Sequence, residues 1–145
     1  MWTVPPARMK AGVEHCVPLS PSAVDLLSAI MPKDPDPAAL VFAVRGAARS
    51  NMAMTMLLRR MGYGNITVHG FRSTFMDWCH EQTAFPKVVI DMALAHTVGD
   101  KVEAAYRRGD LLKKRQALAE AWGRYCCSPP SESGKVLPLH RGAST

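Results

Sequence analysis

Residues 68–83 read VHGFRSTFMDWCHEQT, and apolar side chains recur in this stretch at the spacing of an amphipathic helix. We expect a helix from about Val68 to Glu81, with Thr67 as its N-cap. The residues expected on its apolar stripe are Phe71, Phe75, Trp78 and Cys79. This helix is the element around which the rest of the chain can be arranged.

Two polar side chains near the start of this helix could carry chemistry. His69 and Arg72 are three residues apart, so they share one face of a helix. A phosphodiester would suit such a pair, because a guanidinium fork fits the non-bridging oxygens and an imidazole can exchange a proton. The ordinary alternative is an incidental pair on a helix surface, and an H-x-x-R spacing alone is a weak signal.

Helical patterns also follow this stretch. Pro86 opens a helix to about Ala95, with Val89, Met92 and Ala93 facing inward. A turn at residues 96–100 leads to a short helix, capped by Asp100, that holds Val102, Ala105 and Tyr106. Asp110 is expected to cap a last helix to about Tyr125, with Leu111, Leu112, Leu118 and Trp122 on its apolar side.

Two further helices are predicted upstream. Ser20 and Pro21 form a helix start, and Pro32 requires that helix to end by Met31. Residues 40–44 form a short apolar strand or extended segment, and residues 45–49 form a basic loop. Ser50 or Asn51 would cap a helix to about Met61, with Gly62 at its C-terminal cap. The side chains expected to face inward on it are Met52, Met56, Leu57 and Met61.

The N-terminal region predicts a small β element. Trp2–Val4 and residues 15–19 form two short strands around a turn that carries Arg8 and Lys10. The predicted class is therefore mainly α with a small β-sheet or hairpin at the N-terminal side (α+β). From Ser128 onward the sequence SPPSESGK has the composition of a disordered tail.

Composition excludes several classes of protein. The chain has 145 residues, which suits one domain, and no apolar run approaches the length of a membrane span. Eighteen Lys and Arg against twelve Asp and Glu give a net charge of +6, which is compatible with a polyanionic partner or with a merely solvated surface. The four cysteines have no metal-ligand spacing and indicate reduced thiols. We therefore expect a cytoplasmic protein.

Three more residues have both an ordinary and a functional interpretation. His96 follows an apolar helix, where a histidine usually serves the helix dipole or a local hydrogen bond. Tyr106 is either a half-buried aromatic or a nucleophilic phenol, which needs nearby cations or a base because its ordinary pKa is about 10. Lys10 is either a solvated charge or a general acid.

In this order, these pieces resemble the tyrosine recombinase (phage integrase) family. VHGFRSTFMDWCHEQT at residues 68–83 resembles the second motif of that family, and MALAHTVGDKVEAAYRRGD at residues 92–110 resembles its nucleophile motif. MKAGVEHCVPLS at residues 9–20 resembles its lysine hairpin. The likeness is greatest to integrases of prophages and genomic islands, and the ordered set of Lys, H-x-x-R, His and Tyr is far more specific than any one part.

The resemblance implies a role for each candidate residue. Tyr106 would attack the scissile phosphorus and form a 3′-phosphotyrosyl link, and Arg72 would hold the non-bridging oxygens. His69 and His96 would position the phosphate and help to move protons, and Lys10 would protonate the departing 5′ oxygen. No metal or cofactor is implied. The implied partners are double-stranded DNA and other integrase protomers on that DNA, in the nucleoid of a bacterial cytoplasm, with no membrane.

The sequence departs from the family pattern in two ways. The family has another arginine, on a helix before the lysine hairpin, and neither Arg8 nor Arg45 stands at a matching position. Ala95 stands where many relatives have Gly. The resemblance therefore predicts that residues 1–127 form part of a catalytic domain, that residues 128–145 form a tail, and that recombination is impaired. The alternative is an inactive remnant that binds DNA or protein.

Overall fold

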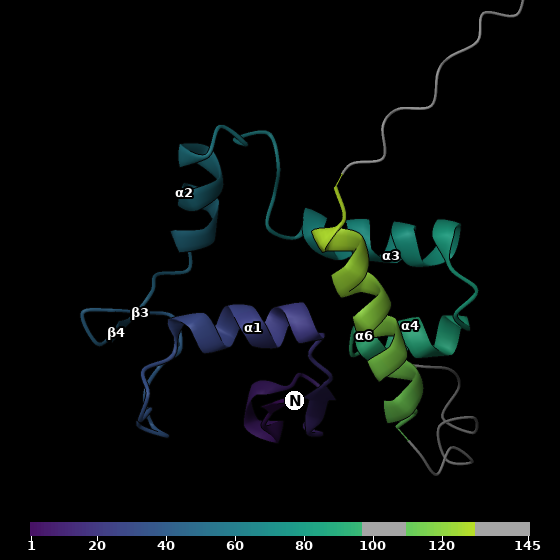
Figure 1. The fold of residues 1–145 in the computed structure, drawn as a ribbon, viewed down its shortest axis with the longest axis horizontal. Helices are drawn as coiled ribbons and strands as arrows, with labels where there is room; N and C mark the ends of the chain where they lie inside the picture. Colours follow the sequence, from purple (N-terminus) through teal and green to yellow (C-terminus); the bar gives the residue numbers. More distant parts are fainter. Residues whose placement is uncertain (97–109, 130–145) are drawn as a thin grey trace, which may run out of the picture.

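The structure is a computed structural model, and it describes residues 1–96 and 110–129 (Figure 1). Within these ranges it contains five α-helices, one short 3-10 helix and two small antiparallel sheets. The elements are β1 (Trp2–Val4), η1 (Pro6–Arg8), β2 (His15–Val17), α1 (Pro21–Ile30), β3 (Ala43–Val44), β4 (Ala47–Ala48), α2 (Ala53–Arg60), α3 (Gly70–Gln82), α4 (Lys87–Ala93) and α6 (Leu112–Cys127). The predicted mainly helical class with an N-terminal hairpin is confirmed.

The two sheets differ in how well the sequence predicted them. β1 and β2 pair antiparallel from Trp2 opposite Val17 to Val4 opposite His15, as expected. In the second sheet, β3 lies within the strand or extended segment predicted at residues 40–44, whereas β4 lies in the predicted basic loop at residues 45–49. The two-residue turn between these strands, Arg45 and Gly46, has φ angles of 50° and 76°. Two consecutive left-handed residues are typical of a two-residue hairpin turn. Arginine is unusual at the first of these positions, so the sequence did not indicate the turn.

Most predicted helix ends are confirmed. Ser20 caps α1, because its Oγ accepts a hydrogen bond from the Ala23 amide at 3.3 Å, and the helix ends before Met31. The Oγ1 of Thr67 accepts from the Gly70 amide at 3.1 Å. However, the N-cap of α3 is His69 and not the predicted Thr67, and the helix begins at Gly70. Gly62 follows α2 with a φ of 86°, the conformation for which a C-terminal glycine is suited.

The predicted cap of α2 is wrong. Neither Ser50 nor Asn51 caps this helix, since Met52 occupies the N-cap position and its side chain makes no capping bond. The Ser50 carbonyl accepts instead from the Ala53 amide at 3.0 Å. A backbone turn ahead of the helix thus takes the place of the side-chain cap.

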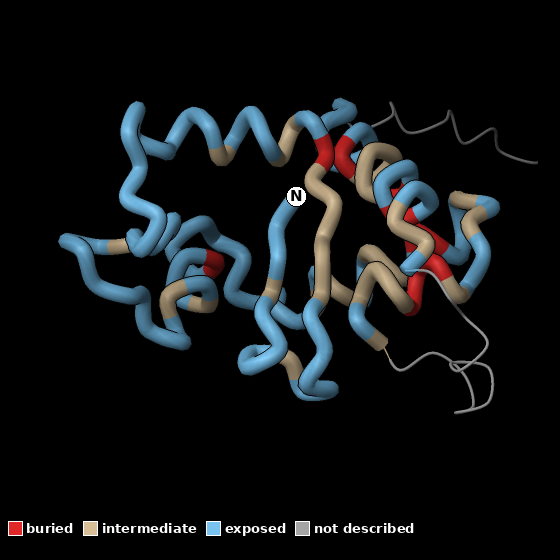
Figure 2. The backbone as a smooth tube through the Cα atoms, turned by 90° about the horizontal axis from the view of Figure 1, so that it is seen from below, coloured by how far each residue is buried: buried red, intermediate tan, exposed pale blue. Residues whose placement is uncertain are grey.

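The hydrophobic core lies between α3, α4 and α6 (Figure 2). Its buried members are Trp78, Cys79, Val89, Ile90 and Leu118. Trp122 lies 5.2 Å from Phe75 and 5.1 Å from Trp78 between ring centroids, which extends the core toward the end of α6. Burial raises the pKa of the Cys79 thiol to about 11, so this cysteine stays a neutral apolar group at physiological pH.

One glycine sets how closely α6 approaches the start of α1. A Cβ built on Gly123 would lie 2.5 Å from the Ser20 Oγ and 2.6 Å from the Ser20 Cβ. Only glycine allows this approach, although glycine inside a helix costs about 1 kcal/mol relative to alanine. Its place within a predicted helix was a signal that the sequence interpretation did not use.

The part of the chain from residue 31 to residue 68, here called the arm, corrects the predicted burial. Of its residues only Leu58 is buried, whereas Met52, Met56, Leu57 and Met61, all predicted to face inward, are exposed. On α3, Phe71 is also exposed, at 52%, rather than part of the apolar stripe. Figures 1 and 2 show α2 standing apart from α3, α4 and α6. An apolar periodicity predicted the helix correctly, but it does not supply a surface for that helix to pack against.

Some predictions concern residues outside the described ranges. These are the turn after His96, the short helix after Asp100 with Tyr106, and the tail beyond Pro129. Among the described helices, none is both long and apolar enough to cross a membrane.

Candidate functional site

Arg72 connects α3 to the turn that follows α4. Its half-buried side chain donates a hydrogen bond from Nη2 to the Leu94 carbonyl at 2.7 Å, across 22 residues of sequence. Leu94 is the C-cap of α4 and stands two residues before His96. A guanidinium has five N–H donors. The bond to Leu94 therefore orients Arg72 and leaves donors that an anion could use.

The turn at the end of α4 is a Schellman motif. The Ala95 amide donates to the Met92 carbonyl at 3.2 Å, and the His96 amide donates to the Asp91 carbonyl at 2.9 Å. Between these bonds Ala95 has a φ of 53°, a left-handed conformation that glycine adopts at no steric cost. This geometry gives a physical reason why glycine suits the position before His96. It also turns the chain so that His96 lies back against the last turn of α4.

Asp91 is a carboxylate buried beside this turn, with only 7% of its surface exposed. Its Oδ1 lies 3.3 Å from the Nδ1 of His96, and its Oδ2 accepts from the Nζ of Lys87. The hydrogen bond from Lys87 holds the pKa of Asp91 below its ordinary value, burial opposes this, and the contact with His96 lowers it further. Asp91 is therefore ionised at neutral pH.

The sequence interpretation missed Asp91, although a signal was present. Residues 88–96 read VVIDMALAH, so Asp91 is a single acidic residue inside an otherwise apolar helix. A carboxylate is seldom buried unless it is paired. The histidine five residues later was the partner to consider.

The other predicted site residues are less constrained. His69 is exposed at the N-cap of α3, and its carbonyl accepts from the Arg72 amide at 3.0 Å. Lys10 is exposed in the turn between η1 and β2. No hydrogen bond or ion pair among the described residues joins Lys10 to His69, Arg72 or His96. Tyr106 lies outside the described residues.

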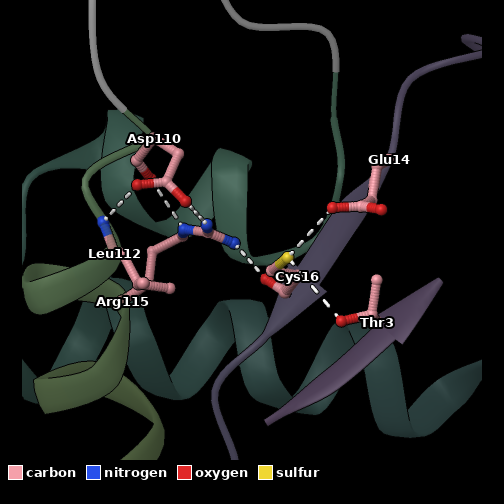
Figure 3. Close-up of polar contacts among 6 residues, drawn as sticks. All are labelled: Thr3, Glu14, Cys16, Asp110, Leu112 and Arg115. Carbon is pink, nitrogen blue, oxygen red and sulfur yellow. Dashed lines mark hydrogen bonds and ion pairs between the residues drawn. The ribbon is translucent and has the colours of Figure 1, made fainter. Parts of the chain in front are cut away.

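A second buried polar cluster fixes α6 to the N-terminal hairpin (Figure 3). Arg115, only 3% exposed, donates from Nη1 to the Cys16 carbonyl at 2.7 Å, from Nε to the Asp110 carbonyl at 2.8 Å and from Nη2 to the Asp110 carboxylate at 2.9 Å. Asp110 also accepts from the Leu112 amide at 3.0 Å. The N-cap position of α6 is nevertheless Leu111 and not the predicted Asp110. Arg115 falls on the predicted apolar side of α6 between Leu111 and Leu118, and that position was the signal for its burial.

The described residues contain no group of three or more His, Cys, Asp or Glu side chains that could hold a metal ion. The polar groups near α4 are instead a guanidinium, an imidazole, an ammonium and a carboxylate, from Arg72, His96, Lys87 and Asp91. Such a set can bind an anion and exchange a proton.

Comparison with known proteins shows that this chain is a homologue of the phage and prophage integrases. It is 32% identical over 143 residues to prophage integrase IntA of Escherichia coli strain K12. The aligned region covers 96% of this chain and 34% of that protein. Prophage integrase IntZ of the same strain is 35% identical over 121 residues, 81% of this chain and 30% of that protein. The integrase of Shigella phage Sf6 is 27% identical over 124 residues, 83% of this chain and 32% of that protein.

The chain thus spans about a third of the length of the curated relatives it matches. No family model matches the chain, and no solved structure matches it significantly. The relationship to the integrases therefore comes from sequence homology over nearly the whole chain.

Proposed function

We propose that this chain cleaves and rejoins duplex DNA through a covalent link between Tyr106 and a 3′ phosphate. The phenol oxygen attacks phosphorus, its proton passes to one of the two histidines, and the bond to the 5′ oxygen breaks as Lys10 protonates that oxygen. Arg72 stabilises the charge that develops on the non-bridging oxygens. Attack of the 5′ hydroxyl on the link reverses these steps and releases Tyr106. Residues 1–127 would form the part of the protein that carries this chemistry.

The observation that carries the proposal is the hydrogen bond between Arg72 and the Leu94 carbonyl. It joins the helix with the H-x-x-R pair to the turn that ends at His96, so two of the proposed phosphate ligands come from adjoining elements. Homology to integrases over 96% of the chain supports the same assignment. The role of Tyr106 depends on the family resemblance.

We expect the reaction to be slow when these 145 residues are assayed alone. The resemblance implies a second arginine on the transition state, and neither Arg8 nor Arg45 matches it. Removal of one donor of this kind typically costs about 10²–10³ in rate. The assay must therefore let the covalent protein–DNA adduct accumulate, and the amount of adduct is measured in place of the turnover rate.

The second candidate function is binding of DNA without covalent chemistry. It is favoured by Lys10, which is exposed and has no described contact with Arg72 or His96. A net charge of +6 is compatible with affinity for duplex DNA, and such affinity would fall as salt rises. Both candidates predict binding, but only the first predicts a covalent adduct.

A suicide substrate separates the two. The chain is incubated at low salt with a pool of nicked, phosphate-labelled duplexes that represent candidate attachment sites, and products are resolved on a denaturing gel. We expect a labelled protein–DNA adduct that Tyr106→Phe abolishes without a change in DNA affinity. Tyr63→Phe, which changes an exposed tyrosine of the arm, is the matched control and should form the adduct normally. Binding with no adduct, in wild type and both variants, would support the second candidate.

A further inference from the structure

His96 is held by one residue in two ways. Its backbone amide donates to the Asp91 carbonyl at 2.9 Å, and its Nδ1 lies 3.3 Å from the Asp91 carboxylate. The first contact fixes the position of the chain, and the second fixes the rotation of the ring. An ordinary C-terminal helix turn needs only the first of these contacts.

The environment of Asp91 fixes its charge. The residue follows Val89 and Ile90 of the core. Among the residues that the structure describes, the atoms within hydrogen-bond distance of its carboxylate are the Nζ of Lys87 and the Nδ1 of His96. Both carboxylate oxygens therefore have partners. An ionised carboxylate only accepts hydrogen bonds, so the contact with His96 requires the proton to be on Nδ1.

A proton fixed on one ring nitrogen determines the chemistry of the other. In a neutral imidazole with Nδ1 protonated, Nε2 carries the lone pair and can accept a proton, or donate one once the ring is charged. Lys87, whose side chain is 75% exposed, reaches Asp91 from solvent and does not replace His96 as a partner. Each partner uses a different oxygen.

We propose that Asp91 is a positioning residue, which selects the Nδ1–H tautomer of His96 and directs Nε2 to the reacting phosphate. The proposal rests on the proposed function, in which His96 contacts that phosphate. Asp91 itself touches neither substrate nor nucleophile. Its effect on the reaction passes entirely through the ring of His96.

The first test measures the tautomer without any need for activity. In two-bond ¹⁵N–¹H spectra of the full chain at about pH 8, above the usual range of imidazole titration, the His96 signals are assigned as those lost in His96→Gln. We expect the Nδ1–H form in wild type and a shift toward the Nε2–H form in Asp91→Asn. A wild-type ring in the Nε2–H form, or an unchanged tautomer in Asp91→Asn, would overturn the proposal.

The second test measures adduct formation on the suicide substrate. We expect Asp91→Asn to slow the reaction by at least about tenfold at unchanged DNA affinity, the scale on which loss of a residue that orients a histidine acts. Asp77→Asn, the same change at an exposed carboxylate on α3, is the matched control and should react at the wild-type rate. Lys87→Met should have a smaller effect than Asp91→Asn, because it leaves the contact with His96 in place.

The outcomes separate the two proposals. No adduct with wild type, together with the expected tautomer, would contradict the proposed function and leave the arrangement of Asp91 and His96 intact. An adduct that forms at the same rate in Asp91→Asn would contradict the positioning role and leave the proposed function intact. Thermal unfolding of each variant shows whether a lost signal reflects loss of the fold.

Discussion

The α3–α4–α6 core and the arm at residues 31–68 were predicted from the same kind of pattern, yet they differ in burial. In the core, Leu118 is 0% exposed and packs among side chains of three helices. In the arm, Leu57 lies on α2, which was also predicted from apolar spacing, and it is 40% exposed. Periodicity therefore identifies which face of a helix is apolar, whereas burial depends on a second surface that no local pattern specifies.

The largest expected difference in stability is between two leucine-to-alanine variants, one in the core and one in the arm. Leu118→Ala should lower the free energy of unfolding by about 2–5 kcal/mol, because it removes buried methyl groups and leaves a cavity. Leu57→Ala should change it by less than about 0.5 kcal/mol, as exposed substitutions do. Urea denaturation followed by tryptophan fluorescence measures both. A comparable loss in the two variants would mean that the arm is buried in solution.

The second comparison concerns two glycines. Gly123→Ala would place a methyl group within 2.6 Å of the Ser20 Cβ, and we expect a loss of about 1–3 kcal/mol as α1 and α6 move apart. Gly64→Ala in the arm meets only the Arg59 side chain at 3.9 Å and should be neutral. Melting temperatures of the two variants give the answer, and an unaffected Gly123→Ala would contradict the close approach of the two helices.

The third comparison concerns two left-handed residues. Ala95→Gly relieves the conformation at a φ of 53° beside the core and should raise stability by about 1 kcal/mol, after allowance for the greater freedom of glycine in the unfolded chain. Arg45→Gly relieves a φ of 50° in the hairpin of the arm. We expect no change in global stability there, since the arm can open while the core stays folded. Chemical denaturation distinguishes these outcomes, and a destabilised Ala95→Gly would argue against the left-handed turn.

The smallest effect is on pH dependence. Because the pKa of Asp91 is lowered in the folded chain, the unfolded chain binds more protons as the solution becomes acidic. The stabilisation is fully present above the ordinary aspartate pKa of about 4 and is lost as pH falls through the lower native pKa. Between neutral and acidic pH, the free energy of unfolding should therefore change less for Asp91→Asn than for wild type, as measured by denaturation at a series of pH values. Asp34→Asn in the arm should follow wild type, and identical slopes in all three proteins would contradict the pairing of Asp91.

The sequence predicted those features that depend on neighbours along the chain. Ser20 and Pro21 predicted the start of α1, and Gly62 the end of α2, because caps act within one helical turn. Leu118 was placed correctly on the apolar side of α6. The H-x-x-R pair and His96 were selected as site candidates by motif, and their assignment stays a prediction.

The features that the sequence did not predict depend on partners brought together by the fold. Asp91 lies within five residues of His96, yet only the left-handed Ala95 makes that contact possible. Arg115 can be buried because β2 supplies the Cys16 carbonyl as a partner for its guanidinium. The prediction that Met52 and Met56 face inward was wrong, because it assumed a packing surface that the fold does not supply to α2.

The bond between Arg115 and the Cys16 carbonyl has a consequence for the order of folding. It joins residues 99 apart, and closing a loop of that length costs about 4 kcal/mol of chain entropy. The helices of the core lie closer together in sequence, so their contacts can form before that cost is met. The hairpin that carries Lys10 should then dock last, and changes that weaken its docking should speed unfolding while leaving the folding rate unaltered.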